Sequence, residues 1–320
     1  MAKLYSLYQK GWLPMSLDLL IEKVAAMSNP TVVGLDPRLE YIPGFIKEQS
    51  YQRFGKTLEA AADAVLRFNK SLIDALCDTV PAVKPQCAYY EMFGWHGMKA
   101  LAETIEYARY NNMFVIADAK RNDIGPTMEA YAQAYLGQTE VETSSNEAFN
   151  ADALTVNPYL GSDGIIPLTE ICAKFDKGIF VLCKTSNPSS GELQDIVCGE
   201  LPLYMLVAEL AEKWGEQLPG KYGYNGVGIV AGATYPEQLA RLRERLPNTM
   251  FLIPGYGAQG GQAQDIACAF GREMTGVIVN SSRAIMCAYQ KHGVPETGFT
   301  QAARTEAIAM RDALRNAAKQ

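Results

Sequence analysis

The stretch Met113-Phe-Val-Ile-Ala-Asp-Ala-Lys-Arg-Asn-Asp-Ile-Gly-Pro-Thr127 joins an apolar run directly to a cluster of charged residues. Its first five residues are apolar without alternation, which is typical of a strand that is buried on both faces of a parallel sheet. Short runs of the same kind recur along the chain, at 31–35, 80–84, 153–157, 178–183, 226–231, 250–254 and 276–280. The sequence therefore predicts eight buried parallel strands.

Helical patterns lie between these runs. Apolar residues recur at spacings of three and four residues in the segments 58–76, 203–214, 239–246 and 303–314. Strands that alternate with helices indicate an α/β protein, and eight strands with a closing helix predict a (β/α)8 TIM barrel rather than an open doubly wound sheet. We expect one domain over residues 1–320, with an N-terminal extension at 1–30 and a long connection at 186–226.

The composition disfavours several classes of function. The chain has 29 Lys and Arg residues against 35 Asp and Glu residues, and its net charge of −6 argues against a binder of nucleic acids. Only two histidines are present, which disfavours multi-histidine zinc sites and leaves few places for histidine-based acid–base chemistry. Seven cysteines without a Cys-x-x-Cys motif indicate the reduced thiols of a cytoplasmic protein. No apolar run approaches the ~20 residues that cross a membrane, so we expect no membrane partner.

The charged residues after the run 113–117 form the densest polar cluster. Asp118 and Lys120 are two residues apart on a strand, so both side chains can point into the mouth of the barrel, and Asp123 follows on the next turn. Lys84 ends the neighbouring strand, which makes a Lys–Asp–Lys–Asp array of alternating charge easy to form. Opposite charges keep one another ionised despite burial, and such an array can hold a proton donor close to a developing carbanion. The same spacing also fits an ion-pair network that closes the rim of a barrel.

A second polar feature is the glycine-rich segment Pro254-Gly-Tyr-Gly-Ala-Gln-Gly-Gly261, which is followed by a strand and by Arg283. In a TIM barrel the loops after the seventh and eighth strands commonly bind phosphate through backbone N–H groups. Arg283 would add bidentate hydrogen bonds to the phosphate oxygens. The strand after the segment ends in Asn280 rather than in an acidic residue, which indicates a phosphate loop and not a dinucleotide site. A simple glycine-rich turn is the alternative.

A third feature is the polar stretch Lys184-Thr-Ser-Asn-Pro-Ser-Ser-Gly191 at the end of the fifth predicted strand. Small hydroxyl and amide groups at a strand end can bind the edge of a planar heterocycle. When the stretch is taken alone, a turn stabilised by Ser and Thr side chains is the simpler interpretation.

Together these residues resemble one enzyme family. The run Asp118-Ala-Lys-Arg-Asn-Asp-Ile-Gly-Pro-Thr127 resembles the D-x-K-x-x-D-I-x-x-T motif of orotidine 5'-phosphate decarboxylase. With the segments 157–163 and 254–261, the chain resembles the longer bacterial (type 2) subgroup, and the resemblance runs from Val32 to Arg283. It implies the decarboxylation of orotidine 5'-phosphate to uridine 5'-phosphate, the last step of de novo UMP synthesis. It also implies a homodimer with shared active sites and a reaction without metal or cofactor.

The resemblance implies catalytic roles for the charged array. Lys120 would donate a proton to C6 of the pyrimidine after carbon dioxide leaves, and Asp118 would lie against the substrate carboxylate. Lys84 would bridge the ribose and the charge array. Because the electrons left at C6 have no conjugated sink, catalysis would have to be electrostatic, with a fixed ammonium that stabilises the carbanion as it forms.

The resemblance further implies that Asp123 reaches across a dimer interface to complete the partner's site, with Ile124 and Thr127 beside it. The remaining substrate-binding roles fall to Asp36 at the ribose hydroxyls, Ser186 at the pyrimidine edge, and Gln259 and Arg283 at the phosphate.

Three alternatives stay open at this stage. A metal-assisted sugar-phosphate decarboxylase or aldolase of the same barrel superfamily would need further carboxylates for Mg²⁺ at neighbouring strand ends. Here the second strand ends in Lys84 and the first offers only Asp36, which disfavours that reaction. A Schiff-base enzyme could use Lys120 or Lys184 as its nucleophile. A catalytically silent nucleotide-binding barrel is the third alternative, which the full charge array disfavours.

Overall fold

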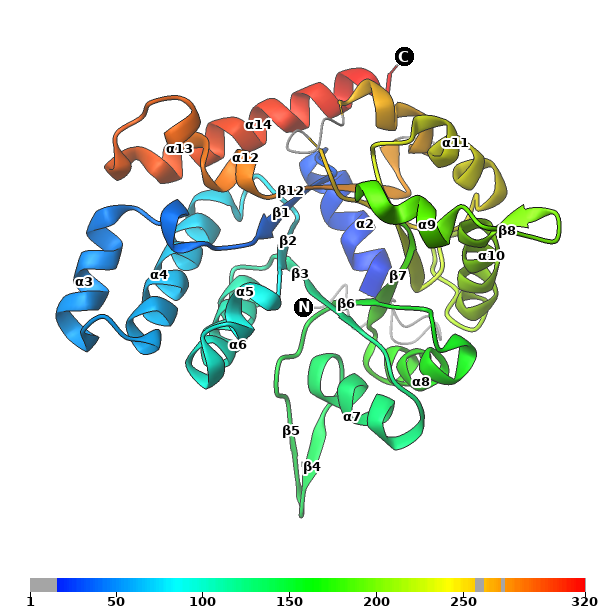
Figure 1. Cartoon of the computed structure of the whole chain (residues 1–320), viewed down its shortest axis with the longest axis horizontal. Coiled ribbons are helices and arrows are strands. Elements are labelled where there is room, and N and C mark those ends of the chain that lie inside the picture. Colours follow the sequence, from blue (N-terminus) through cyan, green and yellow to red (C-terminus); the bar gives the residue numbers. More distant parts are fainter. Residues whose placement is uncertain (1–15, 257–261, 272–273, 320) are drawn as a thin grey trace, which may run out of the picture.

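Eight parallel strands close into a barrel, which confirms the predicted (β/α)8 fold (Figure 1). The computed structural model describes residues 16–256, 262–271 and 274–319. Neighbouring strands follow the order β1-β12-β11-β10-β7-β6-β3-β2, and β2 pairs with β1 to complete the ring. The barrel strands are β1 (Thr31–Leu35), β2 (Ala82–Pro85), β3 (Phe114–Arg121), β6 (Ala153–Val156), β7 (Gly178–Lys184), β10 (Val227–Ala231), β11 (Phe251–Ile253) and β12 (Val277–Ser281).

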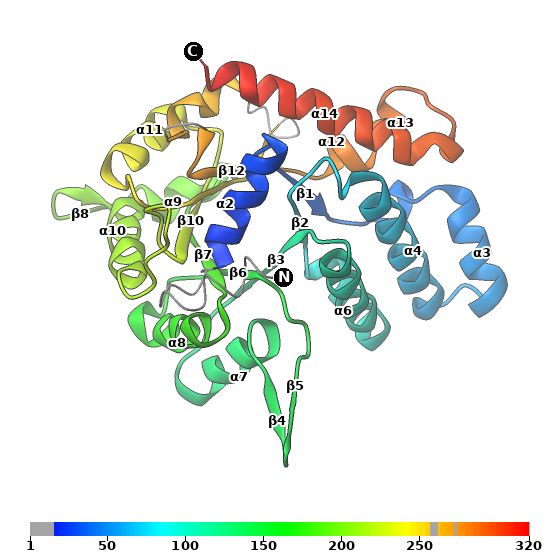
Figure 2. The ribbon, with the colours of Figure 1, turned by 180° about the vertical axis from the view of Figure 1, so that it is seen from behind.

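Helices surround the barrel on its outer side (Figures 1 and 2). The long ones are α3 (Gly44–Phe54), α4 (Leu58–Leu76), α6 (Gly94–Tyr110), α7 (Gly125–Tyr135), α8 (Ile166–Phe175), α10 (Leu203–Gly215), α11 (Pro236–Arg245) and α14 (Phe299–Ala317). Short helices at the loops are α5 (Ala88–Glu91), α9 (Gly191–Gln194), α12 (Arg283–Met286) and α13 (Ala288–Lys291). Short 3-10 helices are η1 (Leu39–Tyr41), η2 (Gly161–Gly164), η3 (Pro188–Ser190), η4 (Gln264–Ala269) and η6 (Glu296–Gly298). Within the described residues, no helix is both long enough and apolar enough to span a bilayer.

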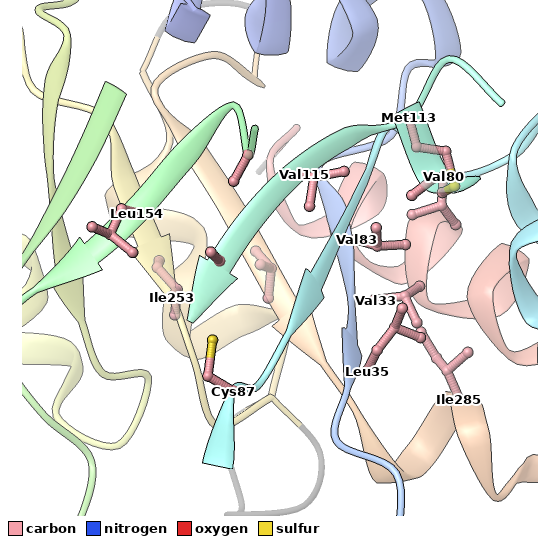
Figure 3. Packing of buried hydrophobic residues seen from close by; sticks show 14 of the residues in the cluster. Val33, Leu35, Val80, Val83, Cys87, Met113, Val115, Leu154, Ile253 and Ile285 are labelled. Carbon is pink, nitrogen blue, oxygen red and sulfur yellow. The ribbon is translucent and has the colours of Figure 1, made fainter. Parts of the chain in front are cut away.

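The strands are apolar on both faces because each face meets other apolar side chains. Val33 on β1, Val83 on β2 and Val115 on β3 point outward and pack under the surrounding helices (Figure 3). Val32, one residue earlier on β1, belongs instead to the cluster that fills the barrel, together with Phe114 on β3. A strand that alternates between two apolar layers reads as a continuous apolar run, which is the pattern that the sequence shows.

The N-terminal segment contains a helix, α2 (Ser16–Met27), that lies across the ring of strands (Figures 1 and 2). Its buried residues pack on side chains near the N-terminal ends of the strands, so the helix closes that end of the barrel. Asp18 accepts a hydrogen bond of 3.0 Å from the backbone N–H of Lys221, and Lys221 pairs with Glu22. The helix is therefore fastened to the last part of the connection at 186–226.

We expect Leu20→Ala to lower the free energy of unfolding by about 2–5 kcal/mol, because Leu20 is 0 % exposed and its loss leaves a cavity between α2 and the barrel. Urea denaturation of the wild-type protein and of Leu20→Ala measures the effect. Leu19→Ala is the matched control, since Leu19 is 40 % exposed on the same helix and its replacement should change stability little. Equal losses for the two variants would show that α2 does not act as a packed closure.

Two small hairpins were not expected from the sequence. The strands β4 (Thr139–Val141) and β5 (Ser144–Asn146) form an exposed hairpin that projects from the barrel (Figure 2). The strands β8 (Val197–Cys198) and β9 (Leu201–Pro202) form a second hairpin inside the connection at 186–226. Both are too short and too exposed to produce a clear apolar pattern, which explains why the sequence does not indicate them.

Candidate active site

A cavity of about 540 Å³ lies at the C-terminal ends of the barrel strands. Leu182, Val230 and Leu252 give it apolar surface, while polar side chains come from strand ends around the barrel. The structure brings together six of the residues that the sequence singled out: Asp36, Lys84, Asp118, Lys120, Ser186 and Arg283.

The carboxylate of Asp118 is the centre of the polar network in this cavity. Its Oδ2 accepts hydrogen bonds from Lys84 Nζ at 2.5 Å and from Gln86 Nε2 at 3.0 Å. Its Oδ1 accepts from Lys120 Nζ at 2.6 Å and from Thr155 Oγ1 at 2.8 Å. Both lysines thus point at one buried carboxylate, which fixes their ammonium groups a few ångströms apart.

The backbone at the end of β3 is irregular, and this irregularity sets the direction of Lys120. The pairing of β3 with β6 shifts register between Ala117 and Arg121, and Lys120 has a φ of 51°. That conformation is uncommon for a residue with a side chain and costs of order 1–3 kcal/mol. The backbone N–H of Lys120 donates to Thr155 Oγ1 at 3.1 Å, so the hydroxyl that binds Asp118 also holds the strained residue.

The charges of the array keep one another ionised. Burial lowers the pKa of Lys84, but the negative charges of Asp118 and Asp36 outweigh burial and leave this pKa raised above its ordinary value. Burial acts on Asp118 in the opposite sense, yet Lys84 and Lys120 outweigh it and hold the carboxyl pKa well below its usual range. At neutral pH the cavity therefore holds a carboxylate fixed between two ammonium groups.

The sequence predicts that phosphate binds where the seventh and eighth barrel strands, β11 and β12, end. Arg283 is the first residue of α12 and lines the cavity next to Ser282. Gly255 also lines the cavity and has a φ of 93°, which residues with a side chain rarely adopt. Gln259, which the resemblance assigns to the phosphate, lies in the segment 257–261, outside the described residues.

The polar residues at the end of β7 and directly after it differ in whether they line the cavity. Thr185, Ser186 and Asn187 line the cavity. Lys184 does not, because its ammonium group binds Asp195 Oδ1 at 2.8 Å, and Asp195 does not line the cavity either.

The single chain does not bring Asp123, Ile124 or Thr127 to the cavity wall. Asp123 Oδ1 accepts a hydrogen bond of 2.8 Å from the backbone N–H of Ile124. The side chain of Ile124 is 53 % exposed. These three residues lie at the start of α7, outside the site of their own chain.

Sequence reasoning missed Gln86 and Thr155, the two neutral donors to Asp118. A signal for each was present. Gln86 is two residues after Lys84, so it faces the same side of the chain as that lysine. Thr155 is the one hydroxyl within the apolar run 153–157. Tyr41 and Tyr89 also line the cavity and were not identified, because they lie on η1 and α5, two short helical turns that are too brief to give a periodic pattern.

Within the residues that the structure describes, no group of three or more His, Cys, Asp and Glu side chains is arranged to hold a metal ion. The carboxylates at the cavity, Asp36 and Asp118, face lysines instead.

Comparisons with known proteins identify relatives of this chain. Residues 32–294 match the model of the orotidine 5'-phosphate decarboxylase / HUMPS family. An orotidine 5'-phosphate decarboxylase of Rhodopirellula baltica is 43 % identical over 289 residues, which cover 89 % of this chain and 94 % of the relative. One of Caldicellulosiruptor bescii is 41 % identical over 275 residues, with 86 % and 90 % covered.

A solved structure of the OMP decarboxylase of Leishmania donovani superimposes with a TM-score of 0.69 at 33 % identity, covering 93 % of this chain and 99 % of that one. The UMP synthase of the same organism gives a TM-score of 0.71 at 35 % identity, covering 94 % of this chain and 57 % of that one. The residues that match the family model, 32–294, include every barrel strand except the first residue of β1. The chain belongs to the orotidine 5'-phosphate decarboxylase / HUMPS family.

Proposed function

We propose that this protein decarboxylates orotidine 5'-phosphate to uridine 5'-phosphate, the last step of de novo UMP synthesis. The observation that carries the proposal is the arrangement of Lys84, Asp118 and Lys120 in the cavity of a member of this family. A carboxylate fixed between two ammonium groups suits a reaction in which one negative charge leaves and another forms at the same carbon.

The cavity fits the parts of this nucleotide. Its volume of about 540 Å³ lies within the range of small-molecule sites. Arg283, with Gln259, would bind the phosphate at one end, and Ser186 would bind the edge of the pyrimidine. Asp36 and Lys84 would contact the hydroxyls of the ribose, which lies between the phosphate and the pyrimidine. In this orientation C6 of the ring would point toward Lys120.

The reaction then needs little covalent chemistry from the protein. The bond from C6 to the carboxylate breaks, carbon dioxide leaves, and the electron pair remains at C6. The Lys120 ammonium stabilises that pair while it forms and then donates a proton to it, which leaves a neutral amine. The Lys120 side chain is 44 % exposed, so solvent can return the proton for the next turnover.

Asp118 would lie against the substrate carboxylate. Its low pKa keeps Asp118 ionised, so the two carboxylates would repel each other until carbon dioxide leaves. Lys84, buried behind it, keeps Asp118 in place and charged. One well-placed electrostatic donor contributes about 3–4 kcal/mol to such a step, so several fixed groups have to act together.

We further propose that the active protein is a homodimer in which Asp123 completes the site of the partner, together with Ile124 and Thr127. The exposed positions of Ile124 and Thr127, and the partly exposed position of Asp123, at the rim of the barrel support this arrangement. Large apolar side chains are exposed on the segments that follow the adjacent strands β2, β3 and β6, as expected of a surface that a second copy covers: Met92, Trp95, Ile124, Tyr159 and Leu160.

A shared site predicts complementation between two inactive variants. Lys120→Ala and Asp123→Asn should each be nearly inactive alone. After mixing with subunit exchange, half of the dimers are mixed and each has one intact site, so activity should return to about one quarter of the wild-type value. Rates of carbon dioxide release measure this. No recovery, when native mass spectrometry shows mixed dimers, would contradict the shared site.

The seven cysteines, all within the described residues, are free thiols, which supports the proposal of a cytoplasmic protein. We also propose that the partner is a small molecule, because a charge array of this size fits a single nucleotide and not a polyanion.

The proposed function is tested by incubating the purified chain with orotidine 5'-phosphate and measuring carbon dioxide and UMP. We expect equal amounts of both, unchanged by EDTA and by borohydride. Loss of activity with EDTA would favour the metal-assisted reaction, and inactivation by borohydride would favour a Schiff base. Binding without release of carbon dioxide would identify a silent nucleotide-binding barrel.

A further inference from the structure

Lys184 is a buried lysine that the proposed reaction does not use. It is the last residue of β7 and is 1 % exposed. Its ammonium group donates to Asp195 Oδ1 at 2.8 Å and to Ser190 Oγ at 3.3 Å. It also lies 5.0 Å from the centre of the Tyr235 ring. An ammonium group this deeply buried is costly unless it is paired, so Asp195 is the contact that makes the position tolerable.

Asp195 directly follows the short helix α9, and the residue after Lys184 binds the last residue of that helix. The backbone N–H of Thr185 donates to Gln194 Oε1 at 2.9 Å, and Gln194 Nε2 donates to Thr185 Oγ1 at 2.8 Å. Lys184 and the residue after it therefore bind Asp195 and Gln194, which are the residue that follows α9 and the last residue of α9.

These contacts enclose the part of the chain that lines the cavity. Thr185, Ser186 and Asn187 line the cavity. They lie at the start of the loop whose two ends are joined by these hydrogen bonds. The helical pieces within this loop, η3 and α9, are single turns that cannot hold their shape alone. The conformation of Ser186 at the cavity thus depends on the side-chain contacts at the base of the loop.

We propose that Lys184 and Asp195 form a positioning pair that holds the segment 185–195 in the conformation that binds the pyrimidine. This inference rests on the proposed function, because it assigns the pyrimidine edge to Ser186. The pair touches no reacting atom, so it acts on substrate affinity and not on the chemical step. Breaking it frees the loop, and the substrate then has to order the loop when it binds.

The test compares Asp195→Asn with Glu192→Gln. Both variants remove one negative charge at α9 or directly after it, but Glu192 is exposed and is not the partner of Lys184. We expect Asp195→Asn to raise KM for orotidine 5'-phosphate and Kd for UMP about tenfold, with kcat changed less than twofold. Glu192→Gln should leave all three within twofold of the wild type. Because the Asp195 side chain is 40 % exposed, the substitution should not prevent folding.

Two further measurements separate positioning from general destabilisation. Hydrogen exchange of the amides in 186–196 should accelerate in Asp195→Asn and return to the wild-type rate with saturating UMP. Asp195→Glu, which keeps the charge, should recover part of the lost affinity. Equal KM values for Asp195→Asn and Glu192→Gln, or a loss in kcat without a change in KM, would overturn the inference. A wild-type chain without decarboxylase activity would instead overturn the proposed function.

Discussion

Replacing Lys120 with Ala is expected to reduce the rate of decarboxylation by at least about 10⁴-fold, while UMP still binds with a Kd within about tenfold of the wild-type value. The ammonium group of Lys120 has two tasks in the proposed reaction. It stabilises negative charge at C6 while carbon dioxide leaves, and it then supplies the proton. Alanine removes both, and a water molecule in its place would be neither charged nor fixed.

Binding should survive because the phosphate and the ribose are held by other residues, among them Arg283 and Asp36. The Lys120 side chain is partly exposed and its strained backbone is held by Thr155, so the variant should fold. Lys99→Ala is the matched control, since Lys99 is exposed on α6 and does not line the cavity. Steady-state rates of carbon dioxide release and calorimetric titration with UMP give the two quantities. Near-normal turnover of Lys120→Ala would remove Lys120 from the mechanism.

The second large effect is expected from Asp118→Asn, which should lower the free energy of unfolding at pH 7 by about 3–5 kcal/mol and abolish most of the activity. Asparagine keeps the shape of the side chain and removes its charge. Lys84 then remains buried without its principal counter-charge, and Lys120 loses the group that directs it. Urea denaturation measures the stability, and the rate of carbon dioxide release measures the activity.

The variant should also differ from the wild type in its dependence on pH. In the wild type, the lowered pKa of Asp118 contributes stability above about pH 4, which is lost as the pH falls through the folded-state pKa. The raised pKa of Lys84 contributes stability below about pH 10, which is lost as the pH rises through the folded-state value. Stability from this pair is therefore flat between those limits.

In Asp118→Asn, burial is no longer outweighed, so the pKa of Lys84 should fall below its unfolded value of about 10.4. The variant should then become more stable as the pH rises from 7 toward 10, because the buried amine can lose its charge. Asp163→Asn, at an exposed aspartate outside the cavity wall, should keep the flat profile. A flat profile for Asp118→Asn would mean that Lys84 does not depend on this carboxylate.

Much of the fold follows from local pattern, because the barrel strands are apolar on both faces and most of them end in polar residues. The same regularity explains why Lys84, Asp118 and Lys120 could be placed in one site, since all barrel strands end at a common rim. The backbone conformation that directs Lys120 could not be predicted. The sequence pattern allows Lys120 to face the cavity by simple alternation, whereas the structure reaches this through a register shift and a positive φ.

Lys184 shows a second limit of sequence reasoning. Its place at the end of a strand suggested a cavity residue, but its ammonium group is paired with Asp195 outside the cavity. That partner is eleven residues away along an irregular connection, and no periodic pattern links the two. The role of α2 could not be foreseen for a related reason, because an amphipathic helix before the first strand does not reveal which end of a barrel it covers.

The most direct test of direct carbon dioxide loss at C6 is the position of deuterium in UMP that the enzyme forms in deuterium oxide. The Lys120 ammonium group exchanges its protons with solvent, so proton delivery to a C6 carbanion predicts one deuterium at C6 and ordinary hydrogen at C5. Nuclear magnetic resonance of the product distinguishes the two positions. Deuterium at C5 would contradict this mechanism, because it would show that the ring was protonated or attacked before carbon dioxide left.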